Sequence, residues 1–227
     1  MIGLEFAGVV KDYRGLRPLR VANLQVALGE CVALSGLDAP AAEAFVTLAT
    51  GAALPDEGQV RVMEQETGAI TDGDAWLASL DRFGIVSYRA VLVDELSIAQ
   101  NIAMSYSLSV DPIPDDVRAK VDALAASAGL SHDDLDRGPA TVNAAARLKA
   151  HVARALAHDP DVLLLEHPTM HVDRADARPL GAAIAAATRG RHIAVLALSD
   201  DDELAKGMGG RRLKVKIATG AVSRRYF

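Results

Sequence analysis

The chain has 227 residues, of which 50% are hydrophobic and 24% charged, with a formal net charge of −6. This length suits one medium-sized domain or a domain with a subdomain, and the apolar content excludes extensive disorder. The single cysteine, Cys31, excludes an internal disulfide framework and fits a reducing compartment. The N-terminus does not resemble a signal peptide, and no apolar run approaches the roughly 20 residues of a bilayer span. We therefore expect a soluble, cytoplasmic chain without direct membrane insertion.

Basic residues form only one cluster, near the C-terminus. It consists of Arg211, Arg212, Lys214, Lys216, Arg224 and Arg225. No basic stripe with interleaved aromatic residues accompanies it, so we expect no nucleic-acid partner. We interpret the cluster as a solvated strand and tail.

The first third of the chain is typical of strands followed by a helix. Apolar residues alternate through the first thirty positions, and the wholly apolar residues 31–34 predict a strand covered on both faces, as in parallel sheets. Asp38 and Pro40 are start signals for an alanine-rich helix over residues 41–50, which Gly51 ends. Alternation predicts another strand over residues 59–63.

The rest of the chain returns to this pattern after a helical middle. Residues 90–150 are largely helical by pattern, and apolar runs over 162–165 and 193–198 then flank a helical segment over 180–188. Strand, helix and strand in this order predict an α/β protein with a mainly parallel sheet. The helical middle is then an insertion into that core.

The last third of the chain carries a family resemblance. Residues 153–169 read ARALAHDPDVLLLEHPT, and Asp173 follows four places later. This stretch resembles the Walker B region of ABC-type ATPases, the nucleotide-binding subunits of ABC transporters. Further segments are similar along nearly the whole chain, in order: Tyr13 at the adenine-stacking aromatic, the turn at residues 55–58, the segment 96–102 after the Q-loop, and the H-loop region at 199–205.

The resemblance implies one ABC-type nucleotide-binding domain over residues 1–227. Its fold would be a P-loop NTPase-like core with a mainly parallel sheet, an N-terminal antiparallel β part and an inserted helical subdomain. The core would comprise residues 1–88 and 152–227, and the helical subdomain about residues 89–151.

The phosphate loop of this family reads GxxxxGK[ST], in which backbone N–H groups wrap the phosphates, the lysine bridges them and the hydroxyl holds magnesium. The positions matching the loop are Gly36, Asp38, Ala39, Ala41, Ala42, Glu43 and Ala44. Ala42 stands at the lysine, Glu43 stands at the hydroxyl, and Pro40 lacks an N–H donor.

These substitutions predict weak triphosphate binding. A lost charge-assisted hydrogen bond costs about 1.5–3 kcal/mol. A carboxylate roughly 4 Å from a phosphate costs about 4 kcal/mol at an effective dielectric constant near 20. Together these correspond to a loss of roughly a thousandfold or more in affinity. Two alternatives remain: a magnesium ion bridges Glu43 and the phosphate, or Glu43 itself occupies the helix N-terminus.

The other motif positions are also substituted. The resemblance places Tyr88 at the Q-loop glutamine, Asn143, Ala144 and Ala145 in the signature, Glu166 at the Walker B aspartate, His167 at the general base, Asp173 in the D-loop and Asp200 at the H-loop histidine. It places Glu43, Tyr88 and Glu166 at the magnesium positions. Histidine can act as a base near neutral pH, so His167 does not by itself exclude chemistry.

Several of these residues have a second interpretation. Tyr13 is either an adenine platform or a half-buried aromatic at a strand edge, and Asp173 either caps a helix, pairs with an arginine or takes part in hydrolysis. His167 and His171 follow Glu166 but do not match the H-E-x-x-H pattern of zinc sites. The acidic run at residues 200–203 is also typical of a solvated turn and helix start.

Three functions are open on the sequence. The first is a working ATPase subunit of an ABC transporter, with ATP and magnesium as cofactors. The second is a catalytically degenerate subunit that docks on a membrane permease or on a second ABC ATPase subunit, in a homodimer or heterodimer, through the Q-loop and helical subdomain. The third is a regulatory or scaffold protein outside transport. We predict an ABC transporter ATP-binding subunit, and within that family the degenerate version, located at the cytoplasmic face of the membrane through its permease.

Overall fold

The computed structural model describes residues 1–225. An antiparallel sheet is built from the N-terminal part of the chain. Its strands run in the order β2-β1-β4-β5 and comprise β1 (Ile2–Lys11), β2 (Leu19–Ala27), β4 (Glu57–Val62) and β5 (Gln65–Glu66). Alternating residues of β1, such as Leu4 and Phe6, are fully buried, so one face of this sheet packs against the interior.

A second, mainly parallel sheet forms the centre of the molecule. Its six strands run in the order β10-β9-β3-β8-β7-β6 and are β3 (Cys31–Ser35), β6 (Phe83–Ser87), β7 (Val162–Glu166), β8 (Ala194–Leu198), β9 (Arg211–Lys216) and β10 (Ala221–Arg224). Only β10, at one edge, is antiparallel to its neighbour. The expected α/β fold, with an antiparallel N-terminal part and a mainly parallel sheet, is confirmed.

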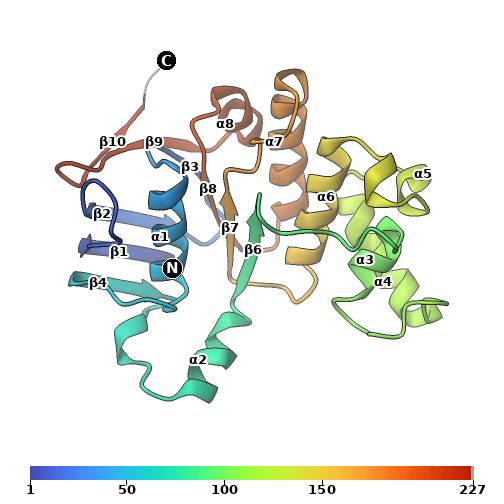
Figure 1. Ribbon diagram of the computed structural model, residues 1–227, viewed down its shortest axis with the longest axis horizontal. Coiled ribbons are helices and arrows are strands. Elements are labelled where there is room, and N and C mark those ends of the chain that lie inside the picture. The colour runs from blue at the N-terminus through green and yellow to red at the C-terminus, as the bar shows by residue number, and fades with distance from the viewer. Residues whose placement is uncertain (226–227) are drawn as a thin grey trace.

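Helix α1 (Ala39–Ala49) lies between the two sheets, as Figure 1 shows. The ring of Phe45 on α1 stacks on the ring of Phe6 on β1, with centroids 4.1 Å apart. Val162 and Leu164 on β7 face this core, whereas Leu163 and Leu165 face the opposite one. The wholly apolar strands therefore result from burial on both faces.

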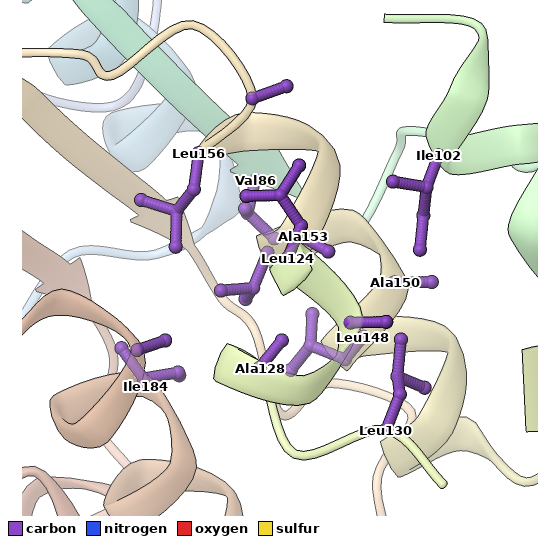
Figure 2. Close-up of a cluster of buried hydrophobic side chains, with 14 of the residues drawn as sticks. Val86, Ile102, Leu124, Ala128, Leu130, Leu148, Ala150, Ala153, Leu156 and Ile184 are labelled. Atoms are coloured by element: carbon purple, nitrogen blue, oxygen red, sulfur yellow. The ribbon is translucent and has the colours of Figure 1, made fainter. Parts of the chain in front are cut away.

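Helices cover the opposite face of the parallel sheet (Figure 1). They are α6 (Ala144–Ala155), α7 (Arg174–Thr188) and α8 (Asp202–Met208), and beyond α6, away from the sheet, lie α3 (Ile98–Ala103), α4 (Asp115–Ser127) and α5 (His132–Leu135). Leu124, Leu148 and Ile184, from three of these helices, belong to one buried cluster with Val86 on β6 (Figure 2). This cluster packs the helical segment against β6, β7 and β8.

Three helices differ from the sequence-based expectations. Helix α2 (Gly73–Leu80) has no buried residue, and therefore no apolar pattern that predicts it. Helix α7 begins at Arg174, before residue 180, and contains Pro179. Helix α6 continues through the boundary expected between residues 151 and 152. Two 3-10 turns, η1 (Thr67–Ala69) and η2 (Pro139–Thr141), complete the described elements. Within residues 1–225, no helix has the length and apolarity needed to cross a membrane.

Candidate functional site

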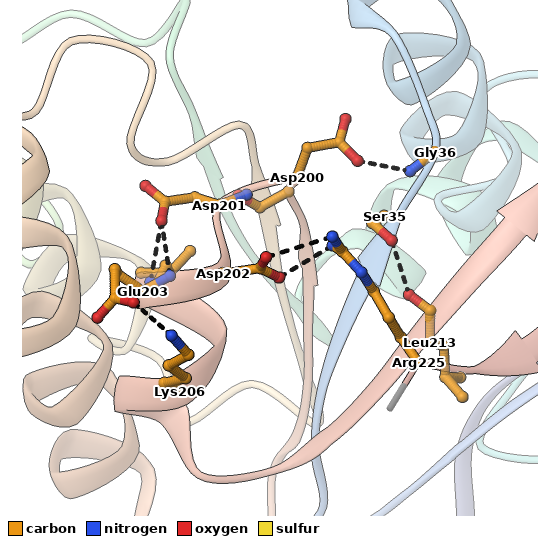
Figure 3. A network of polar contacts seen from close by, with 11 residues as sticks. Ser35, Gly36, Asp200, Asp201, Asp202, Glu203, Lys206, Leu213 and Arg225 are labelled. Atoms are coloured by element: carbon orange, nitrogen blue, oxygen red, sulfur yellow. Dashed lines mark hydrogen bonds and ion pairs between the residues drawn. The ribbon is translucent and has the colours of Figure 1, made fainter. Parts of the chain in front are cut away.

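The candidate site lies where β3 ends and α1 begins. Gly36, directly after β3, has a φ of +95°, and a Cβ there would lie 2.4 Å from the carbonyl oxygen of Val215, so only glycine fits. The N–H of Gly36 donates a hydrogen bond of 2.9 Å to Oδ1 of Asp200, which follows β8 (Figure 3). The carboxylate of Asp200, at the expected H-loop position, therefore accepts a hydrogen bond from the first N–H group of the expected phosphate loop.

The N-terminus of α1 is capped from within the loop. Oδ1 of Asp38 accepts a hydrogen bond of 3.0 Å from the N–H of Ala41. Pro40 provides no N–H in this turn. Ala42, at the expected lysine position, is fully buried, and Ala44 is also in the core, whereas Ala39 is partly exposed. The N–H groups of Gly36 and Ala41 are thus engaged by protein carboxylates, and position 40 has none.

Glu43 does not occupy the helix N-terminus, and that expectation is wrong. Its side chain, 54% exposed, forms an ion pair with the guanidinium of Arg89. Glu43 lies one residue after Ala42 on α1 and therefore points away from the core, while Asp38 satisfies the helix end instead.

Arg89 joins the two carboxylates at the expected magnesium positions. Its Nη2 atom lies 2.9 Å and 3.1 Å from the two carboxylate oxygens of Glu166, and its Nη1 atom pairs with Glu43. The Glu166 side chain is 1% exposed, at the end of β7. Burial alone would lower the pKa of Arg89, but hydrogen bonds to Glu166 and Glu43 outweigh it and raise the pKa, so the guanidinium stays charged.

Arg89 was missed by the sequence reasoning, although it is next to Tyr88. The sequence signal that could have identified it is a cation directly after the residue at the substituted Q-loop position. The guanidinium also lies over the ring of Tyr88, with 5.8 Å between its Cζ atom and the ring centroid. Tyr88 is therefore packed beside the ion pairs.

His167 follows Glu166 in a left-handed backbone conformation, with a φ of +43°. Its ring meets the ring of Tyr88 edge to face, with centroids 6.3 Å apart. Within residues 1–225, the buried Nε2 atom of His167 has no hydrogen-bond partner. The imidazole at the expected general-base position thus lies at the site, against the ring of Tyr88.

The remaining predicted residues lie around this centre. Tyr13 packs on Gly15 and on the α1 core, and burial, with the nearby charge of Asp38, raises its pKa. It therefore lies beside the loop and is partly buried at the end of β1, so both of its interpretations stay open. Asp173 is the N-cap residue of α7, but its side chain makes no capping hydrogen bond.

The expected signature stretch begins α6. Oδ1 of Asn143 accepts a hydrogen bond of 2.8 Å from the N–H of Ala146 and so caps the helix. Ala144 and Ala145 form its first turn. Asp201 caps α8 in the same manner, because its Oδ1 atom accepts hydrogen bonds from the N–H groups of Glu203 and Leu204 (Figure 3). The acidic run at residues 200–203 therefore forms the expected turn and helix start.

A cavity of about 650 Å³ adjoins the site on the helical side. The segment from Ser87 to Glu95, the start of α6 and the loop around His171 line it. Val91 is 80% exposed at its rim, and His151 on α6 lies in its wall. Burial, with the charges of Arg154 and Arg147, lowers the pKa of His151 to about 4. Over the described chain, no group of three His, Cys, Asp or Glu side chains is placed to hold a metal ion, so His167 and His171 form no zinc site.

Comparisons with known proteins converge on one group. No family model matches the chain. The lipoprotein-releasing system ATP-binding protein LolD of Saccharophagus degradans is 28% identical over 176 residues, which are 76% of each chain. The methionine import ATP-binding protein MetN 2 of Burkholderia mallei is 27% identical over 209 residues, 91% of this chain and 52% of the relative.

Solved structures give the same result for the fold. The dimeric structure of MJ0796, a bacterial ABC transporter cassette, matches with a TM-score of 0.77 and 19% identity, covering 99% of this chain and 100% of that one. The structure of cbiO1 from Clostridium perfringens, part of the ABC transporter complex cbiONQ, matches with a TM-score of 0.77 and 16% identity over 98% of this chain and 87% of that one. At these identities the structures establish the fold alone.

Proposed function

Because the chain is a homologue of ABC transporter ATP-binding proteins and has the fold of ABC ATPase cassettes, we propose that it is a transporter subunit with a degenerate nucleotide site. In this role it binds a membrane permease, a second ABC ATPase subunit, or both, at the cytoplasmic face of the membrane. Its contribution to transport is then made by its docking surfaces rather than by ATP hydrolysis.

The position of Arg89 carries this proposal. A magnesium ion requires oxygen ligands at about 2.0–2.1 Å in near-octahedral geometry. Glu43 and Glu166 would supply two such oxygens, but the Arg89 guanidinium lies between them and forms an ion pair with each. These residues do not fit a magnesium ion while the arginine is in place. The internal cation therefore supports a site that no longer needs a metal.

The anion side of the site supports the same proposal. Asp200 accepts from Gly36 and Asp38 accepts from Ala41, so protein carboxylates take hydrogen bonds that a phosphate would need. A triphosphate would have to displace them and would meet their negative charge, with Ala42 in place of a lysine. Phosphate recognition by helix N-termini depends on free N–H groups and a favourable dipole, and both are reduced here.

The cavity beside the site supports a retained docking role. Its lining mixes apolar residues with charged ones such as Asp94 and Arg147, and Val91 and Val93 are exposed in it at 80% and 38%. Exposed apolar side chains around a concave surface are typical of protein-binding sites. We assign this surface, between the segment after β6 and α6, to a short helix of the permease.

Equilibrium binding of ATP tests the nucleotide part of the proposal. We expect no binding of ATP at millimolar concentration by titration calorimetry, with magnesium in excess over nucleotide or with a chelator. An Arg89→Gln variant removes the internal cation and keeps a polar side chain of similar length. Micromolar, magnesium-dependent binding by the unaltered chain would overturn the degenerate assignment.

Docking is tested separately by copurification from detergent-solubilised membranes, followed by identification of the partner. We expect a permease or an intact ABC ATPase subunit to copurify with the chain. Val91→Asp places a charge at the rim of the cavity and should abolish copurification, while Leu16→Asp, at another exposed apolar residue, should not. A chain that binds neither partner would be the regulatory or scaffold protein instead.

A further inference from the structure

A hollow lined by basic side chains lies at the other end of the parallel sheet from the phosphate loop. Its volume is about 710 Å³. The cations that line it are Arg178 on α7, Lys206 on α8, Arg211 and Arg212 on β9, and Arg224 and Arg225 at the end of β10. Glu30, just before β3, is the one acidic residue of its lining. We call this cavity the basic hollow.

Three of these cations are held by neighbouring carboxylates. Arg211 pairs with Glu30 at 2.7 Å, Arg225 with Asp202 at 2.9 Å and Lys206 with Glu203 at 2.5 Å. Figure 3 shows the pairs of Arg225 and Lys206 on either side of the start of α8. A guanidinium has five N–H donors, so one carboxylate leaves donors for a ligand. These pairs therefore orient the cations without using all of their hydrogen-bonding capacity.

Two further cations are not held in this way, although the charge of Arg178 acts on Glu203. Arg178 and Arg224 are exposed, and neither forms an ion pair with any residue in the described part of the chain. The hollow thus carries more positive than negative charge, in a chain whose formal net charge is −6. Positive charge concentrated in a concavity focuses the field and attracts anions.

The floor of the hollow is fixed by close backbone packing. Gly209 ends α8 in a left-handed conformation, with a φ of +67°. A Cβ at Gly210 would lie 2.0 Å from the carbonyl oxygen of Cys31, so only glycine permits β9 to start this close to β3. On the other wall, the N–H of Arg225 donates to the carbonyl of Arg212 at 2.9 Å. The cations consequently project from rigid elements.

We propose that the basic hollow binds a small polyanion, free in solution, that carries two or more phosphate groups. Planar guanidinium groups match phosphate oxygens in bidentate pairs, and several of them converge here. The volume lies within the range of about 300–1,000 Å³ that is usual for small-molecule sites. The exposed large apolar side chains of the described chain lie outside this cavity, which favours a small ligand over a lipid surface.

Binding of inorganic tripolyphosphate, without divalent metal and at low salt, tests the proposal by titration calorimetry. We expect micromolar affinity that weakens as sodium chloride is added. The variant Arg178→Gln/Arg224→Gln removes the two exposed cations and should weaken binding at least tenfold, about 1.4 kcal/mol. The control Lys214→Gln/Lys216→Gln makes the same charge change at exposed residues of β9 outside the hollow, and should stay within about twofold of the unaltered chain.

Several results would overturn the proposal. They are no binding of tripolyphosphate at millimolar concentration, equal loss in the two double variants, and binding to phosphatidylglycerol vesicles without binding of tripolyphosphate. The Arg89→Gln variant separates this proposal from the one on the nucleotide site. Suppose that tripolyphosphate binding changes in Arg89→Gln but persists in Arg178→Gln/Arg224→Gln. The anion would then be bound at the phosphate loop, and both proposals would be contradicted. Loss confined to the hollow variant supports this proposal, whatever the outcome with ATP.

Discussion

The guanidinium of Arg89 lies 2.9 Å from the carboxylate of Glu166, although 77 residues separate them in the chain. One partner is a fully buried anion, and the other is an arginine whose side chain is 41% exposed. A buried carboxylate without a cation or metal is unstable relative to the unfolded chain, in which water solvates it. The contact therefore connects the stability of the fold to the occupancy of the expected metal position.

The first prediction concerns the stability of an Arg89→Ala variant. Removal of the guanidinium leaves Glu166 buried and unpaired, and should lower the free energy of unfolding by about 2 kcal/mol, less than for a fully buried pair because Arg89 is partly exposed. Urea denaturation followed by circular dichroism measures this. Arg61 is the matched control, since its side chain is also 41% exposed and its partner Glu5 lies at 3.6 Å. Arg61→Ala should cost less than about 1 kcal/mol; equal effects would contradict the prediction.

The second prediction concerns magnesium. In Arg89→Ala, the carboxylates of Glu43 and Glu166 no longer have an internal cation between them. A magnesium ion that binds there should stabilise the variant by about 1.4 kcal/mol at a concentration ten times its Kd. Thermal unfolding with magnesium chloride, against sodium chloride of equal ionic strength, measures this. The unaltered chain and Arg89→Ala/Glu43→Gln should not respond, and a response in either would show that magnesium binds elsewhere.

The elements of the fold with local signals could be predicted from the sequence. Asp38 followed by Pro40 predicted the start of α1, and Asp38 is indeed its N-cap, although the helix begins at Ala39, two residues before the expected start. Wholly apolar runs predicted β3, β7 and β8, because strands buried on both faces need no alternation. Helix α7 was predicted too short because Pro179 lies inside it, and a proline usually marks a helix end.

The contacts of the site could not be predicted, because they join residues far apart in the chain. Family position assigned Asp200 and Gly36 to separate motifs, and their hydrogen bond across 164 residues depends on β3 and β8 being neighbours in the sheet. Arg89 follows Tyr88 in sequence, yet its partners are on α1 and β7. Sequence reasoning anticipated that a protein side chain could replace the phosphate, but assigned this role to Glu43. The packing of α1 decides the direction of each of its side chains, and it turns Glu43 toward Arg89.

The third prediction concerns acid pH. Burial and the charges of Arg154 and Arg147 lower the pKa of His151 from 6.5 to about 4 in the folded chain. The unfolded chain then binds the proton more readily, so stability is fully present above about pH 6.5 and is lost as the pH falls toward about 4. The loss should not exceed about 3 kcal/mol. Free energies of unfolding at pH 7 and pH 4.5 test it (about half a unit above the upper end of this window and about half a unit above its lower end).

His151→Gln removes this titration and should reduce the difference in unfolding free energy between the two pH values. His132 on α5 is the control, since it is exposed and His132→Gln should leave the difference unchanged. An unchanged difference in His151→Gln would mean that other groups cause the acid sensitivity. Because His151 lines the cavity assigned to the permease, its neutral state adds no further positive charge beside Arg147 on that surface.

The last prediction concerns Asn101, which fixes the rim of the same cavity. Asn101 is fully buried on α3. Its Oδ1 atom accepts a hydrogen bond of 2.7 Å from the N–H of Val93, and its Nδ2 atom donates to the carbonyls of Val93 at 3.0 Å, Leu96 at 3.3 Å and Ser97 at 3.0 Å. One side chain thus satisfies four backbone groups of the segment that lines the cavity.

Asn101→Ala removes all four hydrogen bonds, although the carbonyls of Val93 and Ser97 keep their bonds from the N–H groups of Leu96 and residue 101, and should lower the free energy of unfolding by about 2–3 kcal/mol. Hydrogen exchange should also accelerate at the amides of residues 93–97, because local opening of this segment then no longer has to break the four hydrogen bonds to Asn101. Asn23→Ala, at an exposed position of β2, should change neither quantity. If the cavity binds a permease helix, Asn101→Ala should weaken copurification of the permease while ATP binding stays absent. Faster exchange with full copurification would mean that the partner itself orders the segment, and the rim would then be shaped by binding rather than by Asn101.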